Sequence, residues 1–405
     1  MKTEPVLFSD LLTETRDGEW GEGQETPGHV LCDVIRGTDF SDLHSPQIEL
    51  PQRWIPEHLA DRKALVAGDI VLETAGGTAN QSTGRTALIT PTFMASRNGR
   101  PVLCSSFARH LRVDRAKVNP TYLYYLLQGL YASGYMGVFN LQHTGVARFQ
   151  FTAFRTKTRM SLHADKAQED IAAILSAYDD LIANNQRRIA LLESMAEEIY
   201  REWFVRMRFP EADSLRVQDM LPFDQLCVLS RGFDLPDRDM QPGDVPVIAS
   251  TSIKGYHNVA KVKPPVVTTG RSGSLGTVLL VNEPAWPLNT ALYVKDFKGN
   301  SPYLVFFTLK NLHLENFNAG AGVPTLNRNH LAGIRVHVPS LGVQQAFDRR
   351  IGPMLQLSET LKRSNAGLTT QRDALLPRLI SGKLRVDQMN IQTPPSMRAE
   401  TALAV

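Results

Sequence analysis

The sequence predicts an α+β fold in which two globular domains of mixed strand and helix alternate with two long helices. Two observations predict it: an apolar heptad pattern that occurs twice, and a strand-like stretch with glycine turns in front of each copy. The first pattern starts at Ile171 and the second at Phe347, 176 residues later and in the same phase. The chain therefore looks like a duplicated unit of domain, helix, domain and helix.

Each apolar pattern places ten residues at alternating spacings of four and three. Sustained heptads are typical of a coiled-coil seam, and each helix would be about 50–55 Å long. Nine of the ten positions are apolar in the first copy and seven in the second, where Ser358 and Arg372 interrupt the seam. Each copy also has an Asn near its middle, a residue that fixes register. Besides Ala196 and Trp203, the predicted seam residues are Ile171, Leu175, Tyr178, Ile182, Asn185, Ile189, Leu192 and Ile199 in the first helix, and Phe347, Ile351, Met354, Leu361, Asn365, Leu368, Leu375 and Leu379 in the second.

We expect the domain boundaries to follow these helices. Residues 1–162 would form the first domain, 163–210 the first long helix, 211–340 the second domain and 341–386 the second long helix. The last residues, 387–405, are rich in Gln, Thr, Pro and Ala and are expected to be a disordered tail. Pro353 predicts that the second long helix starts or bends there, because proline removes a backbone hydrogen bond.

A shorter helix is predicted in each domain. Asn119 can cap a helix over Pro120–Gln128, and Pro120 suits the first helical turn. A matching helix is predicted over Pro302–Leu312, 182 residues later, so the repeat extends from the long helices into the domains. Alternating or apolar runs predict strands at Asp69–Glu73, Thr86–Ile89, Val245–Ala249, Val266–Thr269, Thr277–Val281 and Ala291–Val294.

The composition is that of a soluble globular protein of two or three domains, with 405 residues and 42% hydrophobic residues. No long uncharged apolar run is present, and Met1-Lys2 leads into a polar, acidic segment rather than a signal peptide. The three cysteines are widely separated, which argues against a disulfide framework and for a reducing, cytoplasmic location.

The net charge of +3 does not by itself predict a nucleic-acid partner, but basic residues are concentrated in two segments. Residues 254–271 hold four basic side chains and no acidic one, and residues 97–117 hold six basic side chains against Asp114 alone. Such local excess is compatible with a face that follows phosphates. A solvated surface of a mildly basic protein is the alternative.

No catalytic motif is present in the sequence. A phosphate-binding G-x-x-x-x-G-K-[ST] loop is missing, and no His or Cys has metal-ligand spacing. The glycine-rich run Thr269–Gly276 lies between two predicted strands, which indicates a hairpin turn. Asn119-Pro120-Thr121-Tyr122 is similar to an N-P-P-Y/F methyltransferase loop but lacks one proline, so a helix start is the better interpretation. We therefore expect a noncatalytic chain without a metal.

Polar, amide and basic side chains on glycine-rich loops suit recognition instead. Arg and Lys can pair with guanine edges, and Asn and Gln with adenine edges. Lys261 and Lys263 suit phosphates better, and ordinary solvation is the alternative for each residue alone. The candidate DNA-contacting residues are Asn140, Gln142, His143 and Arg148 in the first domain, and Arg231, Ser250, Lys254, Tyr256, Lys261, Lys263, Arg271, Asn289, Asn327 and Arg328 in the second.

Two sequence segments in the predicted long helices resemble conserved regions of the specificity subunit of Type I restriction–modification systems. Gln168–Val205 is similar to that family's central conserved region, and Leu375–Leu384 to its distal one. The second helix lacks the Trp-Phe ending of the first. Weaker likenesses lie within the domains, at Ile35–Asp39, Gly68–Ile70, Val247–Thr251 and Gly273–Gly276.

The resemblance implies two target recognition domains, each reading one half of a bipartite double-stranded DNA sequence. It implies that the two helices pack antiparallel as a spacer, with an internal pseudo-twofold repeat. The chain would be noncatalytic and bind no cofactor. Two methyltransferase subunits would use S-adenosylmethionine for DNA methylation, and two restriction subunits would use ATP and Mg. Candidate contacts for the methyltransferase are Arg187, Arg188, Glu197 and Arg201. The alternative is a coiled-coil protein–protein interaction scaffold without DNA specificity.

Overall fold

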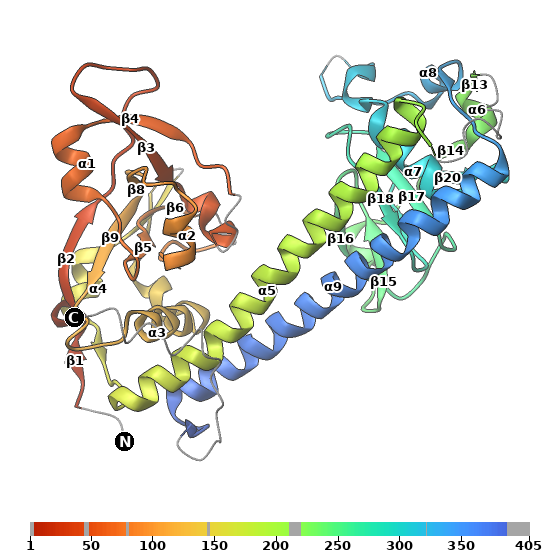
Figure 1. The fold of residues 1–405 in the computed structure, drawn as a ribbon. Coiled ribbons are helices and arrows are strands. Elements are labelled where there is room, and N and C mark those ends of the chain that lie inside the picture. Colours follow the sequence, from red (N-terminus) through yellow and green to blue (C-terminus); the bar gives the residue numbers. More distant parts are fainter. Residues whose placement is uncertain are drawn as a thin grey trace. The chain divides into compact units, whose positions relative to one another are not determined.

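The computed structural model describes residues 4–43, 48–77, 81–143, 146–209, 220–320 and 322–386, except for the side chains of Gln142, His143 and Val146. The chain divides into two compact units, one made of Met1–Arg188 with Leu361–Val405 and the other of Ile189–Thr360. Each unit holds one mixed domain and a part of both long helices, α5 (Asp165–Tyr200) and α9 (Leu341–Ser381) (Figure 1). The predicted α+β class with two domains and two long helices is confirmed.

The first domain is built on two sheets and a short ribbon. The larger sheet is antiparallel with strand order β2-β9-β5-β7, and the smaller has the order β4-β3-β8, in which β3 and β8 run parallel. Its first and last strands, β1 (Val6–Leu7) and β12 (Arg159–Met160), pair with each other. The bounds of the sheet strands are Leu12–Asp17 for β2, His29–Ile35 for β3, Gln52–Pro56 for β4, Ile70–Glu73 for β5, Thr86–Leu88 for β7, Val102–Cys104 for β8 and Ala108–Val113 for β9.

The second domain repeats the topology of these two sheets and of the short ribbon. Its larger sheet has the order β14-β20-β17-β18, its smaller one β16-β15-β19 with a parallel β15–β19 pair, and its end strands β13 (Leu221–Pro222) and β21 (Arg335–Val336) pair. The predicted repeat therefore includes both domains. The bounds are Val228–Arg231 for β14, Val245–Ile248 for β15, Ile253–His257 for β16, Val266–Gly270 for β17, Val278–Val281 for β18, Trp286–Pro287 for β19 and Ala291–Asp296 for β20.

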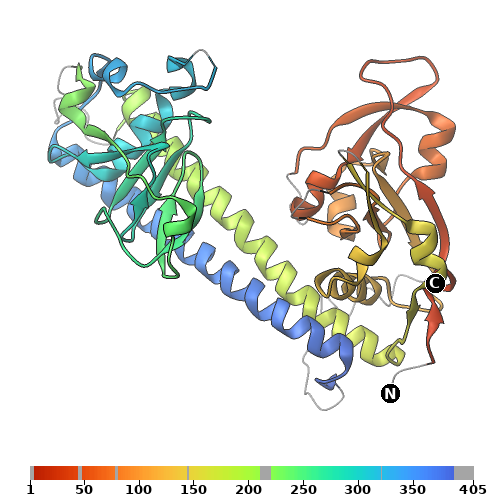
Figure 2. The same ribbon diagram turned by 180° about the vertical axis from the view of Figure 1, so that it is seen from behind.

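Short helices link these sheets to the long helices. α3 (Pro120–Ala132) starts where predicted, because the Asn119 side chain accepts a hydrogen bond from Tyr122 N at 3.0 Å. Its counterpart α7 (Pro302–Asn311) is capped in the same way by Ser301. Asn119-Pro120-Thr121-Tyr122 is thus a helix start, and α3 lies beside the first half of α5 in both views (Figures 1 and 2).

Further short elements complete the domains. The first domain also contains α1 (Glu57–Lys63), α2 (Pro91–Ala95) and α4 (Phe151–Lys157), and the second contains α6 (Phe223–Leu226) and α8 (Arg328–Ala332). The first domain has three more strands, β6 (Ala75–Gly77), β10 (Asn140–His143) and β11 (Val146–Phe149), which form a small sheet of their own. The six strands predicted from the sequence are all present, with ends that differ by one residue at most except for β20, which ends two residues later than predicted.

All twenty positions of the predicted seam are buried or half-buried. Contacts within each unit show that α5 and α9 run antiparallel. In the first unit Asp179 contacts Arg372 and Asn185 contacts Asn365. A residue later in α5 therefore contacts a residue earlier in α9, as expected for antiparallel helices. In the second unit Ser358 Oγ donates to Glu193 at 2.9 Å. The polar residues that interrupt the seam therefore have polar partners.

α9 begins at Leu341, at the predicted boundary of the second long helix, and continues through Pro353. Of the two outcomes expected at this proline, a helix start there is therefore wrong. Val343, Phe347 and Ile351 are buried in the core of the second unit, and this packing holds the turns before the proline in place. Trp203 and Phe204, in the π-helical turn Arg201–Val205, pack on Phe347 with ring centroids 5.9 and 4.9 Å away. The expected tail, 387–405, lies outside the described residues.

Candidate nucleic-acid interface

The candidate residues of the second domain gather where three strands of its larger sheet meet loops. β14 ends at Arg231, β17 ends at Gly270 and β20 begins at Ala291, so these ends lie at the same edge of the antiparallel sheet. Arg271 N donates to Thr290 O at 2.8 Å, and Leu326 N donates to Arg271 O at 2.8 Å. The loop after β17, the loop before β20 and the segment at Leu326 are thereby joined, and we call this place the sheet end.

Three candidates share a polar cluster at this sheet end. Arg231 Nη2 lies 3.3 Å from Asp234 Oδ1, and the Asn289 amide donates to the same carboxylate. Arg271 Nη1 donates to Asn289 O at 3.1 Å. Arg231 is exposed, whereas Arg271 and Asn289 are half-buried. The cluster offers two guanidinium groups and one amide, which are the groups that pair with base edges and phosphates.

Three other candidates hold backbone in place at the same edge. The Ser250 hydroxyl lies 2.7 Å from Ser272 O and 3.2 Å from Thr290 O. Asn327 accepts a hydrogen bond from Asn329 N at 3.0 Å and so caps α8. Arg328 Nη1 donates to Leu229 O at 3.3 Å. These side chains fix the loops that carry the polar cluster.

The remaining four candidates of this domain lie on or just after β16, at the edge of the smaller sheet. Lys254 forms an ion pair with Asp237, and the Lys261 ammonium lies 4.8 Å from the centroid of the Trp286 ring. Tyr256 and Lys263 are exposed. The sequence candidates of the second domain therefore form two groups, one at each sheet.

The first domain has the same sheet end with the same backbone bonds. Thr74 N donates to Phe107 O and Phe149 N donates to Thr74 O, each at 2.8 Å, which matches the two bonds made through Arg271. All four first-domain candidates lie on the β10–β11 hairpin at this end. Arg148 is exposed, and Asn140 accepts a hydrogen bond from Thr83 at 2.6 Å. The side chains of Gln142 and His143 lie outside the described part of the chain.

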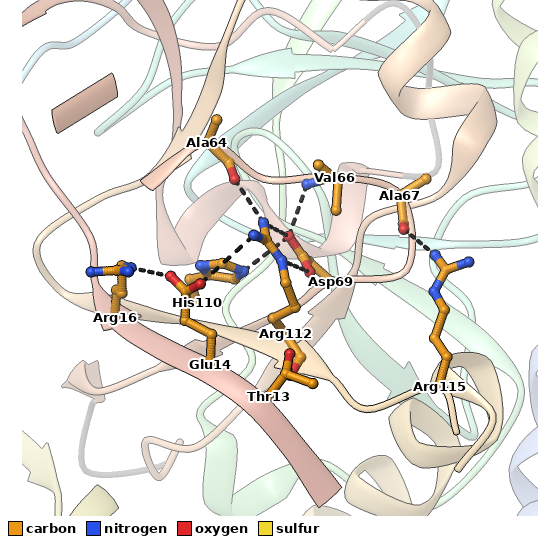
Figure 3. A network of polar contacts seen from close by, with 10 residues as sticks. All are labelled: Thr13, Glu14, Arg16, Ala64, Val66, Ala67, Asp69, His110, Arg112 and Arg115. Atoms are coloured by element: carbon orange, nitrogen blue, oxygen red, sulfur yellow. Dashed lines mark hydrogen bonds and ion pairs between the residues drawn. The ribbon is translucent and has the colours of Figure 1, made fainter. Parts of the chain in front are cut away.

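The basic segment 97–117 is engaged inside the first domain. Arg112 donates two hydrogen bonds to the Asp69 carboxylate, at 3.1 and 2.9 Å, and Arg115 donates to Ala67 O at 2.6 Å (Figure 3). Further ion pairs join Arg100 to Asp33, Arg109 to Asp17 and Lys117 to Asp114. The interpretation of this segment as a face that follows phosphates is therefore not supported by its contacts, because partners distant in sequence bind most of its charges.

Asp69 lies at the centre of this network and is 2% exposed. His110 Nε2 lies 2.9 Å from one carboxylate oxygen, which also accepts from Val66 N at 2.8 Å (Figure 3). Burial alone would raise the pKa of Asp69, but the contacts with His110 and Arg112 outweigh it and lower the pKa below its usual value. The hydrogen bond to Asp69 raises the pKa of Arg112 in turn. The network joins β5 to β9 and has a structural role.

A cavity of about 580 Å³ lies beside the sheet end of the first domain. Its walls combine aromatic and polar groups, and the Arg109 guanidinium lies 4.6 Å from the centroid of the Phe151 ring. The lining residues are Asp17, Thr74, Arg109, Phe149, Gln150, Phe151, Thr152 and Ala153.

Sequence reasoning missed Phe107, which is 63% exposed at the first sheet end. A phenylalanine before a strand predicts a core residue, so no local pattern indicated it. Among the candidate methyltransferase contacts, Glu197 pairs with Arg201 at 2.6 Å and with Lys310 at 2.5 Å, Arg188 is exposed and Arg187 is half-buried.

Two general features bear on function. None of the helices in the described ranges combines the length and apolar character that a membrane span needs. In the same ranges, no group of three His, Cys, Asp or Glu side chains could hold a metal ion. Cys32, Cys104 and Cys227 are buried free thiols.

Known proteins match this chain in sequence and in fold. The family described as "Type I restriction modification DNA specificity domain" matches residues 225–369. The Type I restriction enzyme MjaIX specificity subunit of Methanocaldococcus jannaschii is 21% identical over 257 residues, which cover 55% of this chain and 60% of that relative. The crystal structure of a Type I restriction–modification S subunit from M. genitalium superposes with a TM-score of 0.60 at 15% identity, covering 94% of this chain and 96% of that one. The resemblance carried by the long helices is thereby confirmed: in sequence and in fold, the chain is similar to specificity subunits of Type I restriction–modification systems.

Proposed function

We propose that this chain is the DNA-recognition subunit of a Type I restriction–modification complex, in which residues 1–162 read one half-site and residues 211–340 read the other. One feature supports this proposal above the rest: both domains have the same sheet end, formed by equivalent backbone hydrogen bonds. In each domain this edge presents arginine and amide side chains, the groups that pair with bases and phosphates.

We propose that the chain itself is noncatalytic and acts as a scaffold in the cytoplasm. Methylation and cleavage would belong to partners, namely two methyltransferase subunits that use S-adenosylmethionine and two restriction subunits that use ATP and Mg. The paired helices α5 and α9 would separate the two reading domains, so that the length of the helices sets the gap between half-sites.

The direct test is modification-sensitive, long-read sequencing of a strain with and without this chain, in the presence of its partner methyltransferase. We expect a methyladenine motif of two parts with a fixed spacer to disappear with the chain. An unchanged methylome would contradict the proposal and favour a protein–protein scaffold without DNA specificity.

Exchange of one domain tests whether each domain reads one half-site. Replacing residues 1–162 by those of a relative should change one half of the methylated motif and leave the other half and the spacer intact. Alteration of both halves would contradict one half-site per domain. Phosphate contacts release counterions, so the association constant for DNA should fall as the salt concentration rises. An association constant that does not fall would also favour the protein–protein scaffold.

A further inference from the structure

Phe107 stands on a backbone that the sheet end holds in place. Its carbonyl accepts hydrogen bonds from Thr74 N at 2.8 Å and from Ala75 N at 3.1 Å. On either side of it, Ser105 N donates to Ile35 O at 2.8 Å and Ala108 N donates to Ser105 O at 2.9 Å. A single exposed aromatic residue is ordinary on a protein surface. This one differs because four backbone bonds fix its position at the edge proposed to face DNA.

A row of residues continues from Phe107 through Ala75 and Arg148 to Leu141 across the neighbouring strands, and all of them except Ala75 are exposed. Ala75 is in register with Arg148, and Arg148 is in register with Leu141. Leu141 is 46% exposed and Arg148 is exposed, whereas Ala147 and Phe149 on the other face of β11 are buried. The row therefore places an arginine between two apolar side chains. Arg36, close in the chain to Ile35, is bound to Asp39 and adds little free charge.

The second domain lacks this aromatic group. The hydrogen bond from Arg271 N to Thr290 O corresponds to the one from Thr74 N to Phe107 O, so Thr290 occupies the place of Phe107. Any property that depends on the aromatic ring should therefore be found at one half-site only.

We infer that Phe107 is an apolar wedge that enters between two base pairs of the half-site read by the first domain, while Arg148 contacts the adjacent sugar–phosphate backbone. This inference rests on the proposed function. Proteins that combine an apolar wedge with arginines open a base step from the minor groove and kink the duplex. The aromatic ring supplies stacking to the unstacked step, and the fixed backbone limits the conformational entropy lost on insertion.

The test uses the full chain in complex with its methyltransferase partner and a duplex that contains the methylated motif. 2-Aminopurine is placed in turn at each position of the first half-site except the methylated adenine, which a methyltransferase flips out of the duplex. Its fluorescence rises when a step is unstacked. We expect a rise at one step with the wild type. Phe107→Ala should abolish this rise and weaken binding by about 10- to 100-fold, and Phe107→Trp should retain both. The second half-site, probed at every position except its methylated adenine, should show no rise with either protein.

Val138→Ala is the matched control, because Val138 is 77% exposed in the same domain but lies outside the row. It should leave fluorescence and affinity unchanged, and circular dichroism should show native folding for all variants. Wild-type fluorescence and affinity in Phe107→Ala would overturn the wedge while leaving the proposed function intact. A wild-type complex that does not discriminate the motif from other duplexes would instead contradict the proposed function.

Discussion

Gln168 and Gln344 make the same pair of hydrogen bonds 176 residues apart. Gln168 Oε1 accepts from Asn119 N at 2.9 Å and its Nε2 donates to His163 O at 2.9 Å. Gln344 Oε1 accepts from Ser301 N at 2.7 Å and its Nε2 donates to Pro339 O at 2.9 Å. Both side chains are 2% exposed. Each amide therefore ties the first turn of a long helix to the residue that caps the short helix of its own unit.

Gln168→Leu should destabilise the first unit, because two buried backbone groups lose their partner. An unsatisfied buried group costs about 1–3 kcal/mol, so we expect a loss of about 2–4 kcal/mol in the free energy of unfolding. Chemical denaturation followed by circular dichroism measures it. Gln186→Leu, at an exposed position of the same helix, is the control and should change the stability by less than about 0.5 kcal/mol. Equal effects of the two substitutions would contradict a stabilising role for the two hydrogen bonds of Gln168.

The seam makes a second prediction with an adjacent control. Leu192 is half-buried at a seam position, whereas its neighbour Leu191 is 61% exposed. Leu192→Asp should cost several kcal/mol because it places a charge in the apolar interface, and Leu191→Asp should cost little. Thermal melting monitored by helicity separates the two. Similar melting curves for both variants would contradict the packing of α5 on α9 at this position.

The helices of the fold were largely predictable from the sequence. Heptad spacing and the 176-residue offset are local or periodic signals, so they predicted α5, α9 and the repeated short helices. Asn119 predicted the start of α3 because a cap acts within one turn. The local signal of Pro353, which predicts a helix start or bend, was misleading about the helix start, since packing of Phe347 and Ile351 in the core outweighs the local cost of proline.

The candidate site was predictable only in part, because its contacts join residues distant in sequence. A count of charges over 97–117 indicates a basic face, yet Asp33 and Asp69 neutralise Arg100 and Arg112 from other strands. Ser250 is a polar loop residue in the sequence, and in the structure its hydroxyl donates a hydrogen bond to Ser272 O. Phe107 has the sequence character of a core residue, yet its side chain in the turn before β9 is 63% exposed.

The Asp69 network predicts a specific response to acid. Because the pKa of Asp69 is lowered in the folded state, its contribution to stability is complete above the unfolded pKa of about 3.9 and is lost as the pH falls through the folded value. Asp69→Asn should cost about 2–3 kcal/mol at pH 7, since His110 and the partly exposed Arg112 lose their charged partner.

Denaturation curves collected from pH 7 down to about pH 3 check this response. The difference in stability between wild type and Asp69→Asn should shrink as the pH falls below about 4. Asp61→Asn, at an exposed position of α1, should run parallel to the wild type over the whole range. A constant difference between wild type and Asp69→Asn would contradict a lowered pKa.

Two arginines of the first domain should differ in their effect on DNA binding. Arg148 is exposed on the β10–β11 hairpin, whereas Arg115 donates to Ala67 O within the domain. If Arg148 contacts a phosphate, Arg148→Ala should weaken binding to all duplexes alike and reduce the slope of log K against log salt by about 1. Arg115→Ala should leave the slope unchanged. Titrations of the complex at several salt concentrations measure both. A loss confined to the first half-site, with an unchanged slope, would instead assign Arg148 to a base edge, and an unchanged affinity would remove it from the interface.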